Sequence, residues 1–213
     1  MLQPQEVPAG GIVLDDLDER WDAWRPDEAA DRLRALSAPW CVAGGWALDL
    51  WRGEQTREHS DLEIAIPAWA FGQVRAALER CVFEVVGWGR VWPVDDPAFT
   101  ATHQTWASEP DPRRPGGRAY RVDIFREPAS AGLWACRRDE QITLAYDRVI
   151  GHDAAGIPYL RPEIVLLFKA KHARAKDQAD FDAALPLLQP VAAAWLRAAL
   201  DRVHPGHPWI ESL

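Results

Sequence analysis

The deciding stretch of this sequence is WCVAGGWALDLWRGEQTREHSDLEIAIP, residues 40–67. It begins with a short apolar run typical of a buried strand, which Gly44 and Gly45 interrupt before a short helical segment. After a polar loop, acidic and aliphatic residues alternate. Side chains two positions apart in a strand share a face, so Asp61 and Glu63 should point the same way. The stretch therefore predicts a strand, a glycine turn, a helix and a second strand.

Two features of this stretch indicate binding of a metal ion and a phosphate. The carboxylates of Asp61 and Glu63 repel each other unless a cation lies between them. A strand–Gly-Gly–helix turn leaves backbone N–H groups accessible to phosphate oxygens. Taken alone, two acids at this spacing are more often the exposed face of an edge strand. Together with the glycines, they favour a divalent metal and a nucleoside triphosphate.

A third acid strengthens this interpretation. Asp123 lies in the apolar segment YRVDIF, which predicts a strand at residues 120–125. Three carboxylates on adjacent strands can hold two Mg²⁺ ions, one bridging the triphosphate and one lowering the pKa of an attacking hydroxyl. The alternative is that Asp123 is a core acid in an ion pair, for example with Arg121.

The motifs GGWALDL and TREHSDLEIAI resemble those of the nucleotidyltransferase superfamily with the DNA-polymerase-β-like fold. Within it, they look most like aminoglycoside 2″-adenylyltransferases and the related lincosamide nucleotidyltransferases. The segment IPYLRPEIVLLFKAKHARAKDQADF is similar to their helical C-terminal part, and the resemblance covers residues 40–66, 121–125 and 157–188. It implies an α+β fold, with a mixed sheet flanked by helices in a polymerase-β-like domain and a small helical domain after it.

The resemblance also implies roles for individual residues. Asp61 and Glu63 would be metal ligands, and Asp123 would be the third ligand or the general base that accepts the proton of the hydroxyl. Position 63 departs from the usual pattern, because Glu stands where Asp is common. The implied triphosphate contacts are the backbone at Gly44 and Gly45, the side chain of Lys169 or, less favoured, Lys171, and as weaker candidates Arg57 and His59.

The lysines are unusually clustered. Only three of the 24 basic residues are lysine, and Lys169, Lys171 and Lys176 fall within eight residues. Lysine serves as a compact point charge for phosphate. The competing interpretation is a solvated basic face of a helix.

The remaining patterns predict mixed strands and helices up to about residue 160 and helices alone after it. We therefore expect a flexible tail at residues 1–12, a nucleotidyltransferase domain at 13–160 and a helical domain at 161–213. Helices are expected at residues 14–24, 26–36, 67–80, 164–174, 178–188 and 190–203. Strands are expected at residues 40–43, 60–66, 82–88, 91–94, 120–125, 142–150 and 157–160. Residues 95–117 are expected to form a long polar loop.

Composition restricts the class of protein further. Cys41, Cys81 and Cys136 are odd in number and widely spaced, which favours free thiols in a reducing cytosol. No signal peptide or membrane-spanning segment is expected, so we predict a cytoplasmic protein with no membrane partner. A net charge of −8 argues against a nucleic-acid partner and suits a cationic small molecule.

These observations lead to one main functional hypothesis. We expect a Mg²⁺-dependent enzyme that moves AMP from ATP to a hydroxyl of a small molecule, of the aminoglycoside or lincosamide antibiotic type. Two alternatives stay open. One is a nucleotide-binding sensor or interaction module whose catalysis has lapsed, suggested by Glu63. The other is transfer of a nucleotide to a macromolecule such as tRNA.

Overall fold

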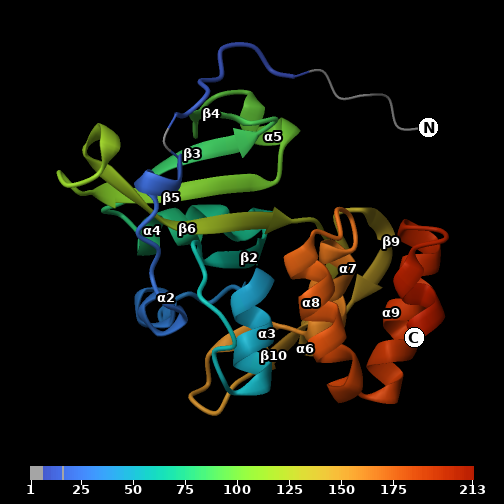
Figure 1. Ribbon diagram of the computed structural model, residues 1–213. Helices are drawn as coiled ribbons and strands as arrows, with labels where there is room; N and C mark the ends of the chain where they lie inside the picture. The colour runs from blue at the N-terminus through green and yellow to red at the C-terminus, as the bar shows by residue number, and fades with distance from the viewer. Residues whose placement is uncertain (1–6, 16) are drawn as a thin grey trace. The chain divides into compact units, whose positions relative to one another are not determined.

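The computed structural model describes residues 7–15 and 17–213 (Figure 1). Contacts divide the chain into two compact units, and neither is continuous in sequence. Unit 1 comprises Met1–Pro39 and Ser60–Glu127, and unit 2 comprises Trp40–His59 and Pro128–Leu213. The predicted domains, 13–160 and 161–213, follow the motifs of the sequence and stay a prediction.

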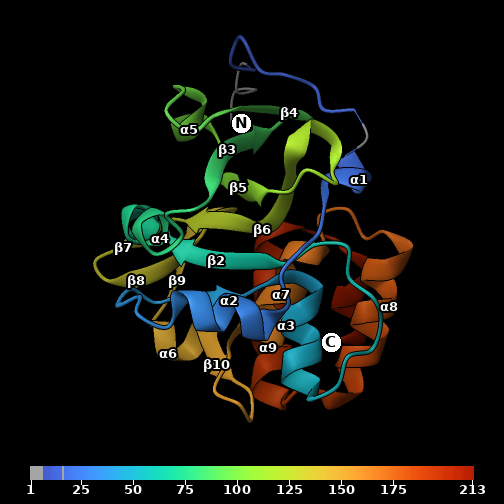
Figure 2. The ribbon, with the colours of Figure 1, turned by 90° about the vertical axis from the view of Figure 1, so that its left-hand side faces the viewer.

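Unit 1 is built on a mixed sheet whose strands follow the order β2-β6-β5-β3-β4 (Figures 1 and 2). β2 and β6 are parallel, while β6–β5, β5–β3 and β3–β4 are antiparallel. The mixed sheet predicted from the sequence is thereby confirmed. The strands are β2 (Glu63–Pro67), β3 (Val82–Gly87), β4 (Arg90–Pro93), β5 (Gln104–Pro110) and β6 (Arg118–Glu127).

The strands predicted at residues 82–88 and 91–94 are confirmed as β3 and β4, which pair as an antiparallel hairpin. Its two-residue turn, Trp88-Gly89, has φ of 49° and 70°. Two consecutive positive φ angles match the twist of the flanking strands, and this explains the glycine. A positive φ is unfavourable for Trp88, because this residue has a bulky side chain. Its ring packs edge-on against that of Trp92, with the ring centroids 6.1 Å apart.

Helices in unit 1 are short. They are α1 (Leu17–Arg20), α2 (Pro26–Leu33), α4 (Phe71–Ala77) and α5 (Ala98–Ala101), with 3₁₀ turns η1 (Ala68–Ala70) and η2 (Pro115–Gly117). α2 packs against α4, and Figure 2 shows α4 end-on beside β2 and β6.

Two predictions in unit 1 are wrong. The expected loop at residues 95–117 contains α5 and all of β5. β5 was missed because its buried positions include Thr105 and Ser108, polar residues that break the apolar pattern. Thr105 tolerates burial because its hydroxyl accepts a hydrogen bond of 2.9 Å from Arg126.

The helix expected over residues 14–24 is limited to α1. After it the chain is extended, because Trp21 forms an isolated bridge with Tyr120 and the N–H of Asp22 donates to the carbonyl of Tyr120. Trp21 also packs on the rings of Trp106 and Tyr120, with centroids 5.4 and 5.5 Å away. Its apolar surface is thus partly buried without a helix.

Part of the predicted tail, residues 1–6, lies outside the described residues. Further along, the indole N–H of Trp92 donates to the carbonyl of Ala9, and Ile12 forms an antiparallel bridge with Val91. Gly11 has no space for a side chain, because a Cβ there would lie 2.3 Å from the Trp92 ring. Residues 9–12 therefore pack along β4.

Unit 2 centres on α7, which contacts α3, α8 and α9. β1 pairs in parallel with β11, β11 pairs with β10, and β7, β8 and β9 form a separate antiparallel sheet. The helices are α3 (Gly44–Arg52), α6 (Tyr146–Val149), α7 (Pro162–Lys169), α8 (Ala175–Ala184) and α9 (Pro190–Val203), with η3 (Leu185–Leu187) and η4 (Pro208–Ser212). The strands are β1 (Cys41–Val42), β7 (Ala129–Ser130), β8 (Leu133–Cys136), β9 (Asp139–Leu144), β10 (Ile150–His152) and β11 (Pro158–Leu160).

Predictions for unit 2 were right about helices and poorer about strands. α9 matches its predicted range, and α7 and α8 each end earlier than predicted. α7 stops because Ala173 adopts φ of 40° and a capping box of Arg174 and Asp177 starts α8. The single strand expected at 142–150 is wrong, since β9, α6 and β10 divide that segment.

No helix within residues 7–15 and 17–213 is long and apolar enough to cross a membrane. Cys41, Cys81 and Cys136 form no disulfide bond among the described residues, and Cys41 and Cys136 are buried.

Candidate active site

Two of the predicted acids lie side by side in unit 1. Glu63 and Asp123 are register partners on the parallel strands β2 and β6, so their side chains share one face of the sheet. The N–H of Asp123 donates to the carbonyl of Leu62 at 2.8 Å. Leu62 and Ile64 are fully buried on the other face, as the alternating pattern predicted.

Asp61 lies just before β2, and its side chain is partly exposed. Its negative charge contributes to raising the pKa of Asp123, less than that of Glu63 does. The two acids of the D-x-E pattern therefore both act electrostatically on Asp123.

Asp123 is a buried carboxyl group with one oxygen left without a hydrogen bond. Its side chain is 3% exposed, and Oδ2 accepts a hydrogen bond of 2.5 Å from Nε2 of Gln104. Trp106 is its cross-strand partner on β5, but neither the indole N–H nor Oδ1 of Asp123 has a well-formed hydrogen bond among the described residues. Burial raises the pKa of Asp123 well above its ordinary value, and the charge of Glu63 raises it further.

Arg121 does not neutralise Asp123. Its guanidinium lies 2.5 Å from a carboxylate oxygen of Asp22 and 3.3 Å from one of Glu109. The alternative interpretation of Asp123 as the ion-pair partner of Arg121 is therefore wrong. Asp123 and Glu63 instead form a pair of carboxyl groups at which a cation would be stabilised.

The acid pair suits Mg²⁺ better than a metal that needs a complete protein cage. Among the described residues, no three side chains of His, Cys, Asp or Glu converge on one point as metal ligands would. Mg²⁺ in nucleotide enzymes commonly takes one or two carboxylates, with waters and phosphate oxygens completing its shell. Glu63 and Asp123 supply such a pair, and the partnerless Oδ1 of Asp123 is a donor atom ready for a cation.

The glycine pair begins α3 in unit 2. Gly44 has φ of 60°, a conformation that favours glycine. A Cβ at Gly45 would lie 2.4 Å from Nη2 of Arg57 and 2.6 Å from Cε1 of His59. The polar loop after α3 therefore folds back, and two of its side chains cover the first turn of that helix.

His59 is fixed in a buried clamp. Its side chain is 3% exposed, and Nε2 lies 2.6 Å from Oδ2 of Asp49. Its ring packs against the Trp46 ring at an interplanar angle of 30°, with the ring centroids 4.5 Å apart. The hydroxyl of Thr56 donates to the other oxygen of Asp49 at 2.6 Å. Burial lowers the pKa of His59, while the bond to Asp49 opposes this effect. Asp49 therefore holds the polar loop through His59 and Thr56.

Lys169, the favoured lysine, is held by two acids of α8. Its ammonium lies 3.1 Å from Oδ1 of Asp177 and 2.8 Å from Oδ2 of Asp180. Asp180 also lies 3.6 Å from Nη2 of Arg57. These four residues, Arg57, Lys169, Asp177 and Asp180, are termed the lysine network below. Asp177 caps α8, and the side chains of Asp177 and Asp180 are both largely shielded from solvent.

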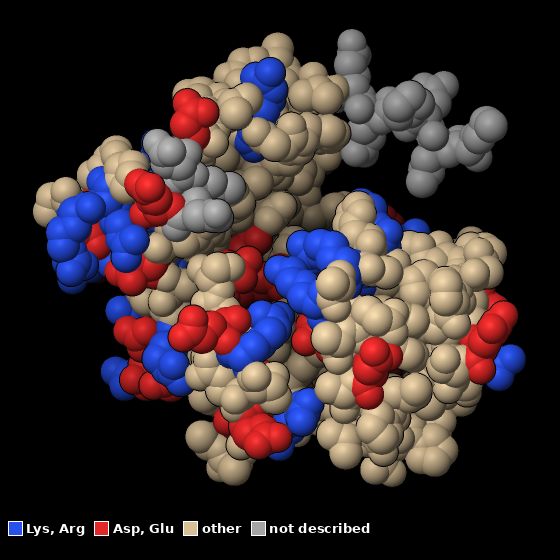
Figure 3. All heavy atoms as spheres, in the orientation of Figure 1, with Lys and Arg blue, Asp and Glu red and all other residues tan. Residues whose placement is uncertain are grey.

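Lys171 and Lys176 are exposed, and Lys171 has no ion pair among the described residues. Figure 3 shows basic side chains gathered over the connection between α7 and α8. The lysine cluster thus divides into one buried member of a network and a solvated basic surface.

Sequence reasoning missed two polar residues of unit 1. Gln104 and Trp106 contact Asp123 from β5, in a segment for which no strand was predicted. In unit 1 the structure brings together Glu63, Asp123, Gln104 and Trp106. In unit 2 it brings together Gly45, Arg57 and His59, and Asp180 connects Arg57 to Lys169.

Comparisons with known proteins follow the same motifs. Residues 27–101 match the model of the aminoglycoside-2″-adenylyltransferase family. A 2″-aminoglycoside nucleotidyltransferase of Escherichia coli is 30% identical over 74 residues, which cover 33% of this chain and 42% of that protein. The predicted resemblance is confirmed. The matched segment contains both glycines, Asp61 and Glu63, whereas Asp123 and Lys169 lie beyond it.

Solved nucleotidyltransferases share the fold. The lincosamide antibiotic adenylyltransferase LnuA, solved with lincomycin, aligns with a TM-score of 0.51 at 20% identity and covers 73% of this chain and 91% of its own. The solution structure of the antibiotic-resistance factor ANT(2″)-Ia aligns with a TM-score of 0.50 at 18% identity and covers 83% and 88%. The chain therefore has a nucleotidyltransferase fold. It spans less than half the length of the curated relative that it matches in sequence.

Proposed function

We propose that this protein is a Mg²⁺-dependent adenylyltransferase that transfers AMP from ATP to a hydroxyl of a small molecule. One observation carries the proposal: Asp123 is a buried acid beside Glu63, with an oxygen that has no hydrogen bond among the described residues. Burying the Asp123 carboxyl beside a second acid is costly, which is typical of a functional site. The matching family segment and the shared fold supply the reaction class.

In this proposal Glu63 and Asp123 form the metal-binding pair, Asp61 becomes the third ligand once a cation draws the three carboxylates together, and Asp123 also acts as the general base. The acceptor oxygen attacks the α-phosphorus of ATP, and the bond from that phosphorus to the β-phosphate bridging oxygen breaks. Pyrophosphate leaves, and the proton of the hydroxyl passes to the Asp123 carboxylate. A bound metal supplies positive charge that lowers the pKa of the acceptor hydroxyl and offsets charge on the phosphates. The proposal includes two Mg²⁺ ions, as expected from three carboxylates.

We assign the triphosphate to the first turn of α3, with Arg57 as its main side-chain contact. The Arg57 guanidinium lies over Gly45 and is about one-third exposed, so it can reach a ligand. Helix N-termini and guanidinium groups both favour phosphate oxygens. His59 is buried and holds this loop in place, so its contribution to phosphate binding is indirect. Lys169 adds positive charge, and Lys171 remains the less favoured lysine.

The acceptor that we propose is an aminoglycoside-type antibiotic, with the lincosamide type as the second choice. The curated relative carries the first activity in its name, and LnuA was solved with lincomycin. The net charge of −8 favours a polycation, because aminoglycosides carry several amines. The lack of a disulfide bond among the three cysteines suits a reducing cytoplasm, where we propose that the enzyme acts.

A second candidate function is nucleotide binding without transfer. It is favoured by the lack of a converged group of three metal ligands among the described residues, and by Glu63 at a position where Asp is usual. Such a module would bind ATP with the same affinity with or without Mg²⁺.

One experiment tests both. The protein is incubated with Mg-ATP and a panel of aminoglycosides and lincosamides, and the acceptors are examined by mass spectrometry for the added AMP mass. We expect a product with at least one aminoglycoside, together with equimolar pyrophosphate, and none with Asp123→Asn. Binding of ATP in a thermal-shift assay without product from any acceptor, and without dependence on Mg²⁺, would instead establish the nucleotide-binding module.

A further inference from the structure

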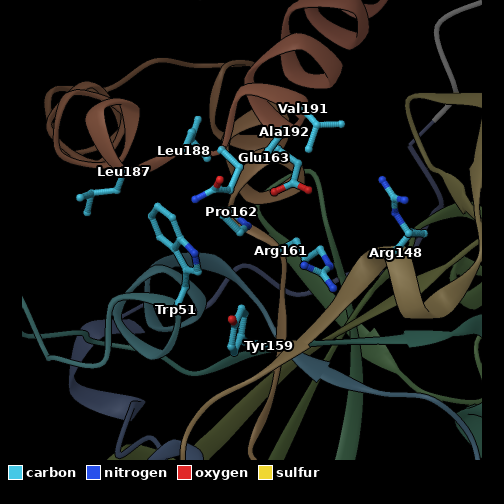
Figure 4. Close-up of a pocket in the computed structure, with 11 residues that line it drawn as sticks. Trp51, Arg148, Tyr159, Arg161, Pro162, Glu163, Leu187, Leu188, Val191 and Ala192 are labelled. Atoms are coloured by element: carbon cyan, nitrogen blue, oxygen red, sulfur yellow. The ribbon is translucent and has the colours of Figure 1, made fainter.

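A pocket in unit 2 contains none of the residues assigned to the nucleotidyl-transfer reaction. It has a volume of about 420 Å³, within the range typical of small-molecule sites (Figure 4). Its walls come from the end of α3, from α6, β11 and η3, and from the starts of α7 and α9. Trp51, Tyr159, Arg161, Glu163, Leu188 and Gln189 are among the residues that line it.

Three charged side chains line this pocket without pairing to one another. Glu163, Arg148 and Arg161 form no ion pair among the described residues, and Arg161 instead donates to the backbone carbonyl of Asp147 at 3.1 Å. Burial raises the pKa of Glu163, and the charges of Arg161 and Arg148 oppose this effect from nearby. By contrast, Lys169 and Arg202 in the same unit are each paired with carboxylates. The pocket therefore offers both signs of charge to a ligand.

The remaining wall is apolar and partly aromatic. Figure 4 shows the rings of Trp51 and Tyr159 on the side of the pocket opposite Glu163. Gly151 accommodates the Tyr159 ring, because a Cβ at that glycine would lie 2.6 Å from ring carbons. The rest of the apolar lining is Pro162, Leu187, Leu188, Val191 and Ala192. Aromatic walls of this kind favour a ligand with a flat or bulky apolar body.

We propose that this pocket binds a small zwitterion with a large apolar side chain, that is, a free α-amino acid of the aromatic or large aliphatic class. The ammonium group pairs with Glu163, the carboxylate pairs with Arg148 and Arg161, and the side chain packs on Trp51 and Tyr159. Each charge of the ligand then meets a protein charge that has no ion pair of its own. This site is separate from the proposed transferase function.

The test uses the full chain and isothermal titration calorimetry with three probes of one ring system. L-Tryptophan carries both charges, tryptamine lacks the carboxylate, and indole-3-propionate lacks the amine. We expect L-tryptophan to bind with a Kd of about 1 mM or tighter, given its size. Each of the other two should bind about tenfold more weakly, because each leaves a charged group unpaired.

Variants locate the binding. Glu163→Gln and Arg148→Met should each weaken L-tryptophan binding about tenfold. Glu211→Gln and Arg197→Met, on other surfaces of the same unit, are the matched controls and should leave the Kd unchanged. A saturating concentration of Mg-ATP should not displace the amino acid.

Three results would overturn the proposal. They are no binding of L-tryptophan, L-phenylalanine or L-leucine, equal binding of all three indole probes, and displacement by ATP. The comparison of probes needs only the wild-type chain, so it holds even if a pocket variant fails to fold. Loss of nucleotidyl transfer in the antibiotic assay would leave this result untouched, so the two proposals fail independently.

Discussion

The acid pair of unit 1 and the lysine network of unit 2 are both charged clusters built around one buried acid, Asp123 or Asp177, but their charges are compensated differently. Glu63 and Asp123 adjoin on parallel strands, and burial together with Glu63 raises the pKa of Asp123. In the lysine network, the Lys169 ammonium is flanked by Asp177 and Asp180 within 3.1 Å. The acid pair has an excess of negative charge, whereas the positive and negative charges of the lysine network balance one another.

The difference separates a site that needs a cation from a structural element. A self-neutralised network stabilises the fold, and removing one member costs free energy because its partner is left buried and charged. A pair of like charges destabilises the fold until a ligand of opposite charge binds, so substitution there should affect activity more than stability. The predictions below test this contrast in order of expected effect.

Asp123→Asn should have the largest effect. We expect transfer of AMP to fall about 1,000-fold or more, because both a metal ligand and the general base are lost. The free energy of unfolding at pH 7.5 should stay equal or rise, because a buried charge is removed. Product formation and urea denaturation measure the two quantities.

The matched control is Asp111→Asn, a buried acid of the same unit that is paired with Arg113 at 2.9 Å. It should keep activity and lose stability. If Asp123→Asn lost much stability and little activity, Asp123 would be a structural acid and the assignment of the acid pair as the active site would be wrong.

Lys169→Met should lower the free energy of unfolding by about 3 kcal/mol, because Asp177 and Asp180 would be left without their buried cation. Lys171→Met is the control, since Lys171 is exposed and has no ion pair among the described residues. It should change stability by less than about 0.5 kcal/mol. Equal effects of the two substitutions would mean that the network contributes nothing to the fold.

Gly45→Ala should cost about 2 kcal/mol, because the added Cβ overlaps the Arg57 guanidinium and the His59 ring. The KM for ATP should rise as Arg57 is displaced from the start of α3. Gly72→Ala is the control in a helix of unit 1, where nothing lies within 4 Å of the added carbon. An unchanged KM would show that Arg57 does not contact the nucleotide.

The loss of stability caused by Asp177→Asn should depend on pH. Burial alone would raise the pKa of Asp177, but hydrogen bonds from Arg174 and the charge of Lys169 lower it below 3.8. The carboxylate therefore stabilises the fold above pH 3.8, and this contribution is lost as pH falls through the lowered pKa.

At pH 7 we expect the free energy of unfolding of the variant to be about 1 to 3 kcal/mol lower than that of the wild-type chain. This difference in stability should shrink as the pH falls below 3.8. Chemical denaturation from pH 3 to 8 measures it. Asp201→Asn, an exposed acid on α9, should show no gap at any pH. A gap that stays constant with pH would assign the effect to packing and not to charge.

Much of the fold could be predicted where apolar periodicity was strong. β3, β4, β6 and α9 lie close to their expected positions, because their buried positions are mainly apolar at the spacing of a strand or helix. β5 could not be predicted, because its burial of Thr105 and Ser108 depends on donors from distant residues. The order of strands also depends on pairings that no local pattern contains.

The candidate site was predictable in part. The pairing of Glu63 with Asp123 follows from two strand patterns, although parallel pairing in register is a tertiary fact. The Lys169 contacts with Asp177 and Asp180 were not foreseen, because charges at helix spacing usually face solvent. Gln104 had no signal at all in the sequence, since a lone glutamine in a polar segment carries no pattern.

The clamp of Asp49, Thr56 and His59 has a consequence for how the chain can be cut or lengthened. α3 ends at Gly53, with φ of 78°, and the clamp holds the chain again from Thr56. Between these anchors, Glu54 and Gln55 are exposed. A peptide tag inserted or a protease nick made after Glu54 would leave both new ends tethered within three residues of the break, so this short link is the place to open the loop without releasing Arg57.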